Sequence, residues 1–518
     1  MPAPREGSLP DTSANLSLPV PPGRDGAGTT PYRHLALALT LTTALALRLW
    51  AVLAHTYVVS EDETFQYLEQ GHRLAFGSGV VPWEYIDGIR SWLLPGAVAA
   101  VMRLAALIDP APRFYILAVR LCCIAASLVL PWVGFRLGER AGGLAGGIVT
   151  GLLGAVWYEA VYDAPVVMTE PLATYAAILA LWLGMPPTTA RRLAAAGVLF
   201  GLAGCLRYQY APALALAALL QHGRDRRALL AVGAAGVLTF GLGAGLLDWL
   251  TWGTPFQSVW LNFARNGVQG IGAAMGTAPW SYYPRHFLTS WGPVAPLLAG
   301  LALLGIPAMP PLAAAAAATV AIHTLTPHKE LRFVFLAIAA APLLIGLGLV
   351  RLRALWPRRH AVLTALGLAA LVAGSEAAFA FARATPADAW HRDAATLHAF
   401  AAAAAVPQMC GLGVRSIWLV RSGGYTYLHR DVPIYFDTYA RAQLLPHNPF
   451  RMRLRIVLDG KPVPQVPDAE LPAASGRFNV LIGRPWDGLP GYAARGCFGS
   501  GARGDEQACV FVRPGGCD

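Results

Sequence analysis

Charged residues are scarce in this chain, and their scarcity excludes an ordinary soluble protein. Only 13% of the 518 residues are charged, 55% are hydrophobic, and the mean hydropathy is +0.47. Soluble globular domains carry charge on about a quarter of their residues. Several apolar runs reach the roughly 20 residues that a helix needs to cross a bilayer. The composition therefore predicts a polytopic protein surrounded by membrane lipid.

Lysine is almost absent, because only Lys329 and Lys461 occur against 38 arginines. The formal net charge of +11 could suggest a nucleic-acid partner. Eleven of the arginines, however, lie in four short segments between apolar runs, which is typical of cytoplasmic loops. We therefore expect no nucleic-acid partner.

The chain also lacks the spacings of cysteine and histidine that form zinc sites, and it lacks a nucleotide-binding motif. A cytoplasmic enzyme that uses nucleotide sugars is therefore not indicated. Four of the seven cysteines lie in the polar C-terminal region, at Cys410, Cys497, Cys509 and Cys517. An even number there is compatible with disulfides if the region faces an oxidising compartment. We expect Cys497 to pair with Cys509 or Cys517.

Twelve apolar runs divide the chain into candidate spans. They lie near residues 34–56, 92–108, 114–135, 142–160, 166–185, 193–206, 209–222, 227–247, 291–308, 312–326, 331–350 and 360–382. Four arginine-rich segments lie between them, at 136–140, 190–192, 223–227 and 351–360. Short cytoplasmic loops collect arginine and lysine, so all four segments should lie on the inner side of the membrane.

Twelve simple crossings do not meet this requirement. If the N-terminus is inside and every run crosses, segment 136–140 falls outside. Treating 92–108 as a helix that lies in or dips into the outer interface brings all four segments inside, and Arg103 already interrupts that run. The sequence therefore predicts an all-α polytopic membrane protein with about 11 transmembrane helices and a large first outer loop over about 57–113.

Polarity divides the chain into three parts. Residues 1–33 are rich in Pro, Gly and Ser and predict a disordered cytoplasmic tail rather than a cleaved signal peptide. Residues 34–382 form the expected transmembrane catalytic domain, and residues 383–518 predict a small extracytoplasmic α/β domain. Its expected strands are 415–420, 452–460 and 477–483. This domain either helps to bind an acceptor glycan or caps the outer loops.

Carboxylates gather in the first two expected outer loops. Glu61, Asp62 and Glu63 stand in a row directly after the first apolar run. The second loop adds three acids and no basic residue: Glu159, Asp163 and Glu170. Acids at the membrane surface are costly unless they are paired or functional. They could act as a general base, although outer loops are also acidic simply because basic residues are retained inside.

The segment 328–332 carries His328, Lys329 and Arg332 at the start of an apolar run. Lys329 and Arg332 are three residues apart and so share one helix face. The free amide donors and the positive dipole of a helix N-terminus favour an anion, and phosphate is the natural candidate here. Interfacial cations that snorkel to the headgroups are the alternative. Arg207, between two short runs, could contact the phosphate or pair with an acid of the second loop.

Aromatic residues are dense on the same face. Trp83, Tyr85 and Trp92 lie in the first loop, and residues 248–291 hold a further group of Trp and Tyr. Such belts are common at membrane interfaces, although sugars also stack on these rings. Acids opposite cations on one face fit the transfer of a sugar from a lipid phosphate, since a carboxylate could deprotonate the acceptor and the cations could stabilise the leaving phosphate.

Two segments resemble the Alg9-like, or GPI-type, mannosyltransferases, which form family 22 of the glycosyltransferases in the GT-C superfamily. The first is "SEDETFQYLEQGHRLAFGSGVVPWEYIDGIRSWLLP", residues 60–95, which is similar to that family's first lumenal loop. The second is "HKELRF", residues 328–333, which is similar to its His-Lys-Glu-x-Arg-Phe motif. The chain departs from the family pattern at Ser60-Glu61, where the family has His-Pro, and at Pro82, where it has Thr.

The resemblance covers about residues 34–382 and implies a GT-C-like fold with inverting transfer of mannose. The donor would be a polyprenyl-phosphate mannose, and the acceptor a glycan or glycolipid. Either Asp62 is the general base and Glu63 its neighbour, or the reverse. The changed residues at 60–61 bear on the identity of the acceptor and of the sugar.

The resemblance also implies which residues bind the substrates. His328, Lys329 and Arg332 would hold the donor phosphate, and Arg207 is a further candidate from its position. The residues expected on the sugar and acceptor side are Gln66, Trp83, Glu84, Tyr85, Arg90, Asp163 and Glu170. No cofactor or metal ligand set is indicated, although these acids could bind a divalent ion.

Two other functions fit parts of the sequence. A transporter or flippase of lipid-linked glycans would also be polytopic with charges in the membrane. Against it, no internal repeat is evident, and the polar residues gather on one face, whereas alternating access needs a site near the midplane. A GT-C enzyme that uses a different sugar is the second alternative. The bias toward Ala, Gly and Arg is typical of a GC-rich bacterial genome, which predicts an inner-membrane protein with its site in the periplasm.

Overall fold

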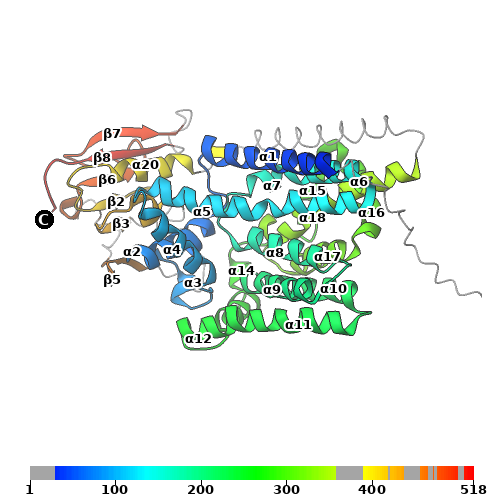
Figure 1. The fold of residues 1–518 in the computed structure, drawn as a ribbon. Coiled ribbons are helices and arrows are strands. Elements are labelled where there is room, and N and C mark those ends of the chain that lie inside the picture. Colours follow the sequence, from blue (N-terminus) through cyan, green and yellow to red (C-terminus); the bar gives the residue numbers. More distant parts are fainter. Residues whose placement is uncertain are drawn as a thin grey trace, which may run out of the picture.

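The computed structural model describes residues 30–356, 389–391, 393–417, 421–436, 455–464, 471, 475–499 and 507–517. Most of the expected tail, the expected span 360–382 and the domain boundary expected at 382–383 lie outside the described residues. The described part consists of a bundle of long helices, with a group of shorter helices and strands at one end (Figure 1).

Long apolar helices form the bundle. They are α1 Thr30–Ala54, α5 Pro112–Ser127, α6 Val129–Val156, α8 Thr169–Leu183, α9 Ala190–Leu206, α10 Ala211–His222, α11 Arg226–Phe240, α15 Tyr282–Trp291, α16 Ala295–Gly305, α17 Pro310–Leu325 and α18 Phe335–Leu355. Most residues of α18 are buried, and it packs against α6, α16 and α17, so it lies in the core of the bundle.

Length and composition identify membrane-spanning candidates among these helices. In the described ranges, five helical segments are long and apolar enough to cross a membrane: Pro31–Ala54, Pro112–Val156, Arg226–Trp252, Tyr282–Ala308 and Leu331–Leu355. Shorter apolar helices such as α8 and α17 pack between them. These findings agree with an integral membrane protein, whereas the expected number of about 11 spans stays a prediction.

Glycines turn the longest of these segments back on itself. Within α6 the backbone leaves the helical conformation at Gly142 and Gly143, and Gly143 has a φ of 64°. The two halves of α6 then pack so closely that a Cβ atom on Gly138 would collide with the carbonyl oxygen of Gly146. The segment Pro112–Val156 is therefore a helical hairpin, as two separate apolar runs require.

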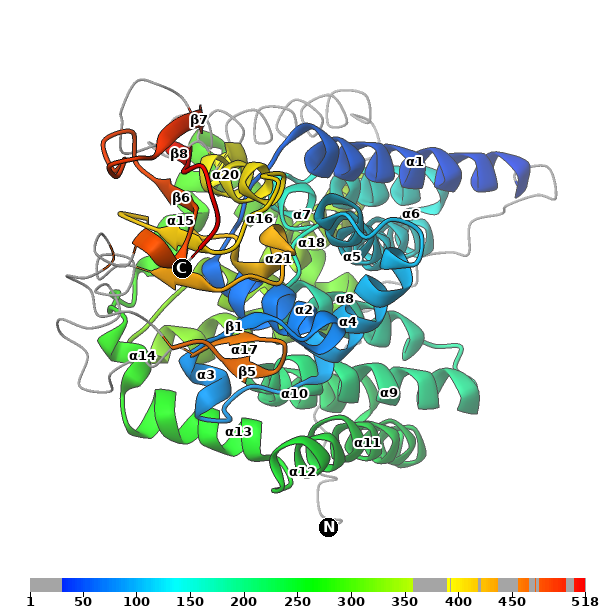
Figure 2. The same ribbon diagram turned by 90° about the vertical axis from the view of Figure 1, so that its left-hand side faces the viewer.

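The segment predicted as the first outer loop, about residues 57–113, folds into short elements at one end of the bundle. A helix that starts at Glu61 contains a π-helical turn, and the chain continues into shorter helices and a strand. These elements are η1 Glu63–Leu68, α2 Glu69–Phe76, β1 Gly79–Val81, α3 Trp83–Ile86 and α4 Leu93–Ala106. The run expected at 92–108 thus forms α4, which packs beside α2 and α5 at the end that carries the strands (Figures 1 and 2).

Two small sheets involve the C-terminal region. The larger has the strand order β3-β2-β6-β8-β7, formed by Ile434–Phe436, Leu412–Val414, Val480–Gly483, Ala508–Val512 and Ala493–Phe498, and α20 Ala394–Ala404 packs on it. The smaller has the order β1-β4-β5, so a strand of the first outer loop pairs with Arg455–Leu458, which continues to Lys461–Pro462. The C-terminal region therefore shares a sheet with the first loop.

The expected strands are found in two of three places. The segments 452–460 and 477–483 contain β4 and β6. The strand expected at 415–420 is wrong for residues 415–417, because β2 ends at Val414 and Ser416 takes a positive φ of 53°, which turns the chain. Residues 418–420 lie outside the described part.

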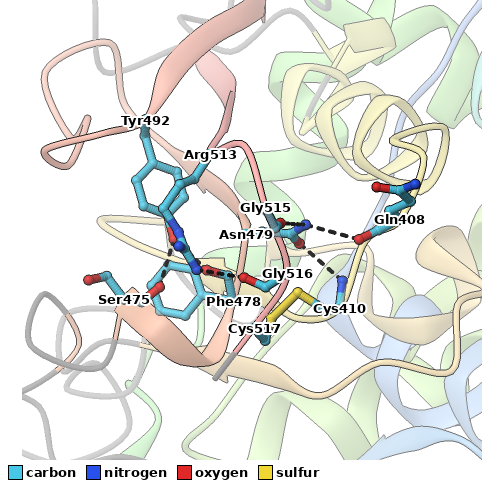
Figure 3. Close-up of a disulfide and its surroundings, with 10 residues drawn as sticks. All are labelled: Gln408, Cys410, Ser475, Phe478, Asn479, Tyr492, Arg513, Gly515, Gly516 and Cys517. Atoms are coloured by element: carbon cyan, nitrogen blue, oxygen red, sulfur yellow. Dashed lines mark hydrogen bonds between the residues drawn. A yellow bond between two sulfur atoms is a disulfide. The ribbon is translucent and has the colours of Figure 1, made fainter.

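Two disulfides close the C-terminal region. Cys497 pairs with Cys509 across the adjacent strands β7 and β8, which confirms the expected pairing, and Cys410 pairs with Cys517. The buried side chain of Asn479 bonds to both segments that the second disulfide joins (Figure 3). Covalent and polar contacts thus tie the chain end back to the start of β2.

A buried carboxylate fastens the C-terminal region to α2. Glu69 has no exposed surface, and its carboxylate accepts hydrogen bonds from Val80 N–H at 2.8 Å and from Tyr425 N–H at 2.9 Å. Thr426 donates its N–H at 2.9 Å and its hydroxyl at 2.6 Å. The two last residues belong to α21 Gly424–Leu428, which lies beside α2 in Figure 2.

A histidine pair makes a second connection from the same helix. His72 Nδ1 donates to the carbonyl of Ser78 at 2.7 Å, so its Nε2 is the acceptor for His429 Nδ1 at 2.9 Å. Burial, followed by the proximity of His429, lowers the pKa of His72 to about 3. The pair therefore favours the neutral form of the His72 imidazole.

Candidate active site

The first-loop acids and the expected cation segment meet at the end of the bundle. Asp62 Oδ2 lies 2.8 Å from Nη2 of Arg332. Asp62 precedes the π-helical turn η1, and Arg332 lies in η7 Leu331–Val334, directly before α18. Both side chains are partly open, with 18% of Asp62 and 14% of Arg332 exposed. Two motifs that are distant in the sequence therefore form one polar site.

Arg332 is shared among three carboxylates. Its Nε and Nη2 each lie 2.8 Å from an oxygen of Glu330, and its Nε lies 4.0 Å from Oε1 of Glu170. Burial opposes ionisation of Glu330, yet Arg332 and His328 lower the pKa of this carboxyl to about 2. The fork of the guanidinium therefore fixes the positions of Glu330 and Asp62 relative to each other.

Glu63 points away from its neighbour Asp62. It is 1% exposed, and its Oε1 lies 3.2 Å from Nη2 of Arg120 on α5 and 3.4 Å from the backbone nitrogen of Val167. Burial raises the pKa of Glu63, and Arg120 opposes this effect. The two adjacent acids, which the sequence left equivalent, thus differ: one is partly exposed, and the other is enclosed in a buried ion pair.

Glu84 and Gln66 form a second polar group beside Asp62. Gln66 Nε2 donates to Glu84 Oε1 at 2.9 Å, and the hydroxyl of Tyr85 donates to the carbonyl of Gln66 at 2.9 Å. Burial and the neighbouring charge of Asp62 raise the pKa of Glu84 to about 7. Trp83 and Tyr85 are buried, so these rings support the loop instead of presenting an open face.

The segment predicted as the second outer loop contributes Glu170 in the first turn of α8. Its Oε1 lies 2.9 Å from Nη1 of Arg207, which follows α9. Thr169 donates to the other oxygen of Glu170 at 3.1 Å and bonds to the hydroxyl of Tyr67 at 3.0 Å. The guanidinium carbon of Arg207 also lies 4.8 Å from the ring centre of Phe333. Arg207 is therefore a partner for a second-loop acid, which is one of the two roles expected for it.

Asp163 lies apart from this group. It follows α7 Tyr158–Tyr162, where burial raises the pKa of its carboxyl well above the usual range and Glu159 and Glu63 raise it further. Within the described ranges, no hydrogen bond or ion pair joins Asp163 to Asp62 or Arg332. Its expected contact with substrate stays a prediction.

The side chains of Lys329 and His328 form hydrogen bonds with backbone carbonyls. The ammonium of Lys329 donates to the carbonyl of Ala278 at 3.0 Å and to that of Thr326, and the residue is 8% exposed. His328 Nδ1 bonds to the carbonyl of Gly276 at 2.9 Å, and its Nε2 lies 3.1 Å from Glu330. The bond to Glu330 raises the pKa of His328, although burial opposes it. Both side chains therefore hold the loop 276–278 against the start of η7.

A cavity of about 50 Å³ opens next to the Arg207–Glu170 pair. It lies between the first outer loop, the start of α8, the end of α9 and α13 Gln257–Asn262. Its wall includes Tyr67, Arg90, Leu94, Arg207, Tyr208 and Val259. Among the described residues, no group of three or more His, Cys, Asp or Glu side chains is arranged to hold a metal ion.

The sequence prediction missed Arg120, the buried partner of Glu63. A signal was present, because Arg120 interrupts the apolar run 114–135, and a charge within such a run is expected to have a specific partner. Glu330 was part of the quoted motif, but its ion pair with Arg332 could not be read from spacing. The buried contacts of Glu69 with α21 had no sequence signal.

Comparison with known proteins identifies relatives over most of the chain. The model of the Alg9-like mannosyltransferase family matches residues 39–388, about two thirds of the sequence. GPI mannosyltransferase 3 of Drosophila melanogaster is 42% identical over 66 residues, and GPI mannosyltransferase 3 of Yarrowia lipolytica is 27% identical over 327 residues. These matches cover 12% and 59% of this chain, and 12% and 61% of the relatives.

Solved structures share the fold at low identity. ArnT from Cupriavidus metallidurans, in a structure bound to undecaprenyl phosphate, has a TM-score of 0.57 and 13% identity, with 94% of this chain and 98% of that chain covered. The archaeal oligosaccharyltransferase AglB from Archaeoglobus fulgidus, in complex with an inhibitory peptide and a dolichol-phosphate, has a TM-score of 0.50 and 11% identity, with 89% and 70% covered. The fold is therefore that of membrane glycosyltransferases.

Proposed function

The chain belongs to the Alg9-like mannosyltransferase family, and we propose that it transfers mannose from a polyprenyl-phosphate donor to a glycan or glycolipid acceptor, with inversion at the anomeric carbon. The observation that carries the proposal is the 2.8 Å pair between Asp62 and Arg332. It unites an acid of the first outer loop with the arginine of the His-Lys-Glu-x-Arg-Phe segment in a partly open site.

In the proposed reaction Asp62 is the general base. Its carboxylate takes the proton of an acceptor hydroxyl while that oxygen attacks the anomeric carbon from the side opposite the phosphate. The bond from that carbon to the phosphate oxygen breaks, and the polyprenyl phosphate leaves with both bonding electrons. Arg332 holds the carboxylate in place, whereas Glu63 is occupied by Arg120 and fixes the helix instead.

The leaving phosphate gains negative charge, and arginines near the site are suited to stabilise it. A guanidinium matches phosphate with two parallel hydrogen bonds, and fixed donors act strongly where water is excluded. Arg332 and Arg207 are the candidates from the paired acids. The undecaprenyl phosphate of the ArnT structure and the dolichol-phosphate of the AglB structure support a lipid phosphate as the sugar carrier.

The acceptor and the compartment are parts of the same proposal. The name of both curated relatives, GPI mannosyltransferase 3, supports mannose as the sugar and a glycolipid as the acceptor. The two disulfides at the end of the molecule that carries the site support an oxidising compartment. From composition alone, this compartment is the periplasm of a bacterium, although both curated relatives are eukaryotic.

A transfer assay tests the proposal. The purified wild-type chain, Asp62→Asn and Glu63→Gln are each incubated with radiolabelled polyprenyl-phosphate mannose and a lipid extract of the source cells. We expect label to enter a glycolipid with the wild type and not with Asp62→Asn, while donor binding persists. Transfer that survives in Asp62→Asn would refute the base assignment. Transfer only from another polyprenyl-phosphate sugar would change the substrate, and donor binding without any transfer would favour a flippase.

The role of a divalent ion is tested in the same assay. Wild-type transfer is compared before and after EDTA and with added Mg²⁺ or Mn²⁺. Because arginines border the site, we propose that transfer is retained in EDTA. Loss of transfer that either ion restores would contradict this proposal.

A further inference from the structure

The helix that carries Asp62 runs from Glu61 through the π-helical turn η1 to the end of α2 at Phe76. Asp62 lies directly before that turn, so the position of the helix sets the position of its carboxylate relative to Arg332. π-Helical turns are rare and are frequent at functional sites. The contacts that support this helix therefore bear on the geometry of the candidate site.

The short helix α21 supports the Asp62 helix from the C-terminal region (Figure 2). Tyr425 and Thr426 donate their N–H groups to the buried carboxylate of Glu69 at 2.9 Å, and the hydroxyl of Thr426 donates to the same carboxylate at 2.6 Å. The carbonyl of Thr426 accepts a hydrogen bond at 2.5 Å from the hydroxyl of Tyr115, a residue of α5 with no exposed surface. Thr426 thus joins the Asp62 helix to a long helix of the bundle.

A second side chain of α21 lies near the beginning of the Asp62 helix. Tyr427 packs against the apolar cluster that contains Tyr67 of the π-helical turn. Burial raises the pKa of the Tyr427 phenol, Arg120 lowers it and Glu63 raises it further, so the phenol lies close to the buried pair of Glu63 and Arg120. Glu63 is the neighbour of Asp62 in the chain. Helix α21 therefore borders the π-helical turn as well as α2.

The fit between the two helices leaves no room for a side chain at Gly424. Its φ of 57° lies in the left-handed region, and a Cβ atom there would lie 2.7 Å from the carboxylate of Glu69. Closely packed interiors transmit a displacement instead of absorbing it. A shift of α21 would therefore move Glu69 and, with it, the helix that holds Asp62.

We propose that α21 is a positioning element of the catalytic centre, which acts through Glu69 and its helix to hold the carboxylate of Asp62 in the geometry for transfer. The role of Asp62 as the base rests on the proposed function. The match to the family model ends at residue 388, so α21 belongs to the part of the chain that this match does not cover. The C-terminal region then contributes to the rate of the chemical step.

Positioning of the base and binding of the acceptor have different kinetic signatures. A displaced base lowers kcat, since a misplacement of about 1 Å can cost about 10²-fold in rate, and it leaves the KM values unchanged. A surface that binds the acceptor glycan acts on the KM for the acceptor instead. The kinetic constants of α21 variants therefore separate the two roles.

Thr426→Val and Thr426→Ser form a matched pair of variants. Valine keeps the shape of the side chain and loses the hydroxyl that donates to Glu69, whereas serine keeps the hydroxyl. The purified full chain is assayed with radiolabelled polyprenyl-phosphate mannose and the lipid extract, well below the unfolding midpoint of each variant. Thr426→Val should lower kcat about tenfold with both apparent KM values within about twofold of the wild type. Thr426→Ser should retain most of the wild-type rate.

Two glycines provide a second matched pair. Gly424 and Gly460 have positive φ angles of 57° and 71°, but a Cβ atom on Gly460 would meet nothing within 4 Å. Gly424→Ala should lower kcat about 10²-fold, whereas Gly460→Ala should leave it unchanged. Hydrogen exchange of the backbone amides of residues 61–76 should become faster in Gly424→Ala and not in Gly460→Ala.

The double variant Asp62→Asn with Gly424→Ala tests whether the effect passes through the base. The residual transfer by Asp62→Asn should fall no further when Gly424→Ala is added, because the two changes act on one group. Independent losses that multiply would overturn this route. A wild-type kcat in folded Thr426→Val and Gly424→Ala would overturn the positioning role, and so would a rise only in the KM for the acceptor.

Failure of the proposed function gives a different result. Transfer at the wild-type rate by Asp62→Asn would refute the base assignment, whereas its loss together with full activity of Gly424→Ala would refute the positioning role alone. If the wild type transfers no sugar, hydrogen exchange still tests the contact. Equal exchange of residues 61–76 in Gly424→Ala and Gly460→Ala would then overturn the support of this helix by α21.

Discussion

Two carboxylates on one helix, Asp62 and Glu69, lie in opposite surroundings. Asp62 is 18% exposed and is balanced by one cation, Arg332, at 2.8 Å. Glu69 has no exposed surface and is balanced by four neutral donors at 2.6–2.9 Å, from residues of β1 and α21. A carboxylate that serves chemistry needs an open face and a partner that can move, whereas a structural carboxylate needs every lone pair satisfied.

The largest expected effect is that of substituting the partly exposed carboxylate, Asp62. Asp62→Asn keeps the shape of the side chain but removes the base, so kcat should fall about 10²–10⁴-fold. The unfolding midpoint should change little, because a partly exposed pair contributes about 1 kcal/mol or less. Initial rates of mannose transfer and thermal unfolding check the two parts. If Asp62→Asn lost stability but kept its transfer rate, Asp62 would have a structural role like that of Glu69.

Glu63→Gln tests the intermediate case, since Glu63 is buried like Glu69 but paired with a cation like Asp62. Removal of its charge leaves Arg120 buried and uncompensated, which should cost about 3–5 kcal/mol of unfolding free energy. The double variant Glu63→Gln with Arg120→Met should recover most of that loss. Chemical denaturation in detergent measures both. Full stability in Glu63→Gln would contradict the buried pair.

Glu69→Gln tests the buried carboxylate. An amide presents one acceptor oxygen where the carboxylate presents two, so donors from β1 or α21 lose their partner, at a cost of about 2–4 kcal/mol. The change should also expose the C-terminal region to protease, because these bonds hold it to α2. Glu61→Gln, an exposed acid at the start of the same helix, is the matched control and should have no effect. Equal protease sensitivity in both variants would refute the connection.

The smallest expected effect concerns the histidine pair next to Glu69. The pKa of His72 is lowered to about 3 in the folded chain, below its ordinary value of 6.5. Between these values the unfolded chain binds a proton that the folded chain does not, so stability is complete above pH 6.5 and falls as the pH decreases through that window. At pH 5 the loss should be about 1–2 kcal/mol.

The measurement compares unfolding midpoints at pH 7.5 and pH 5 for the wild type and His72→Gln. The substitution should lower the midpoint at pH 7.5 and reduce its dependence on pH. An unchanged pH dependence would show that a group other than His72 titrates in this window.

The sequence predicted the surroundings of the partly exposed Asp62 better than those of the buried Glu69. The pairing of Asp62 with Arg332 was suggested by the sequence, because each residue lies in one of the two segments that resemble the family pattern. The direction of Lys329 was not predictable, because a motif states which residues occur and not which atoms they bond. The structural role of Glu69 has no sequence signal, since its partners lie 356 and 357 residues away and form no periodic pattern.

Local patterns also predicted the fold unevenly. The apolar runs and the arginine-rich segments sufficed to separate α4 from the long helices, because charge and hydropathy act over whole segments. The short strand β1 could not be predicted, since a three-residue strand is determined by its partner β4 and not by its own composition.

The hydrogen bonds between Glu69 and α21 can form only after most of the chain has been synthesised. A ribosome that adds about 5–20 residues per second needs about 20–70 s to proceed from Glu69 to Tyr425, 356 residues later. During this interval the helix with Asp62 has been synthesised, but the donors from α21 do not yet exist. A nascent chain that stops before residue 425 would therefore contain Asp62 and Arg332 but not the α21 donors that bind Glu69 on the same helix as Asp62.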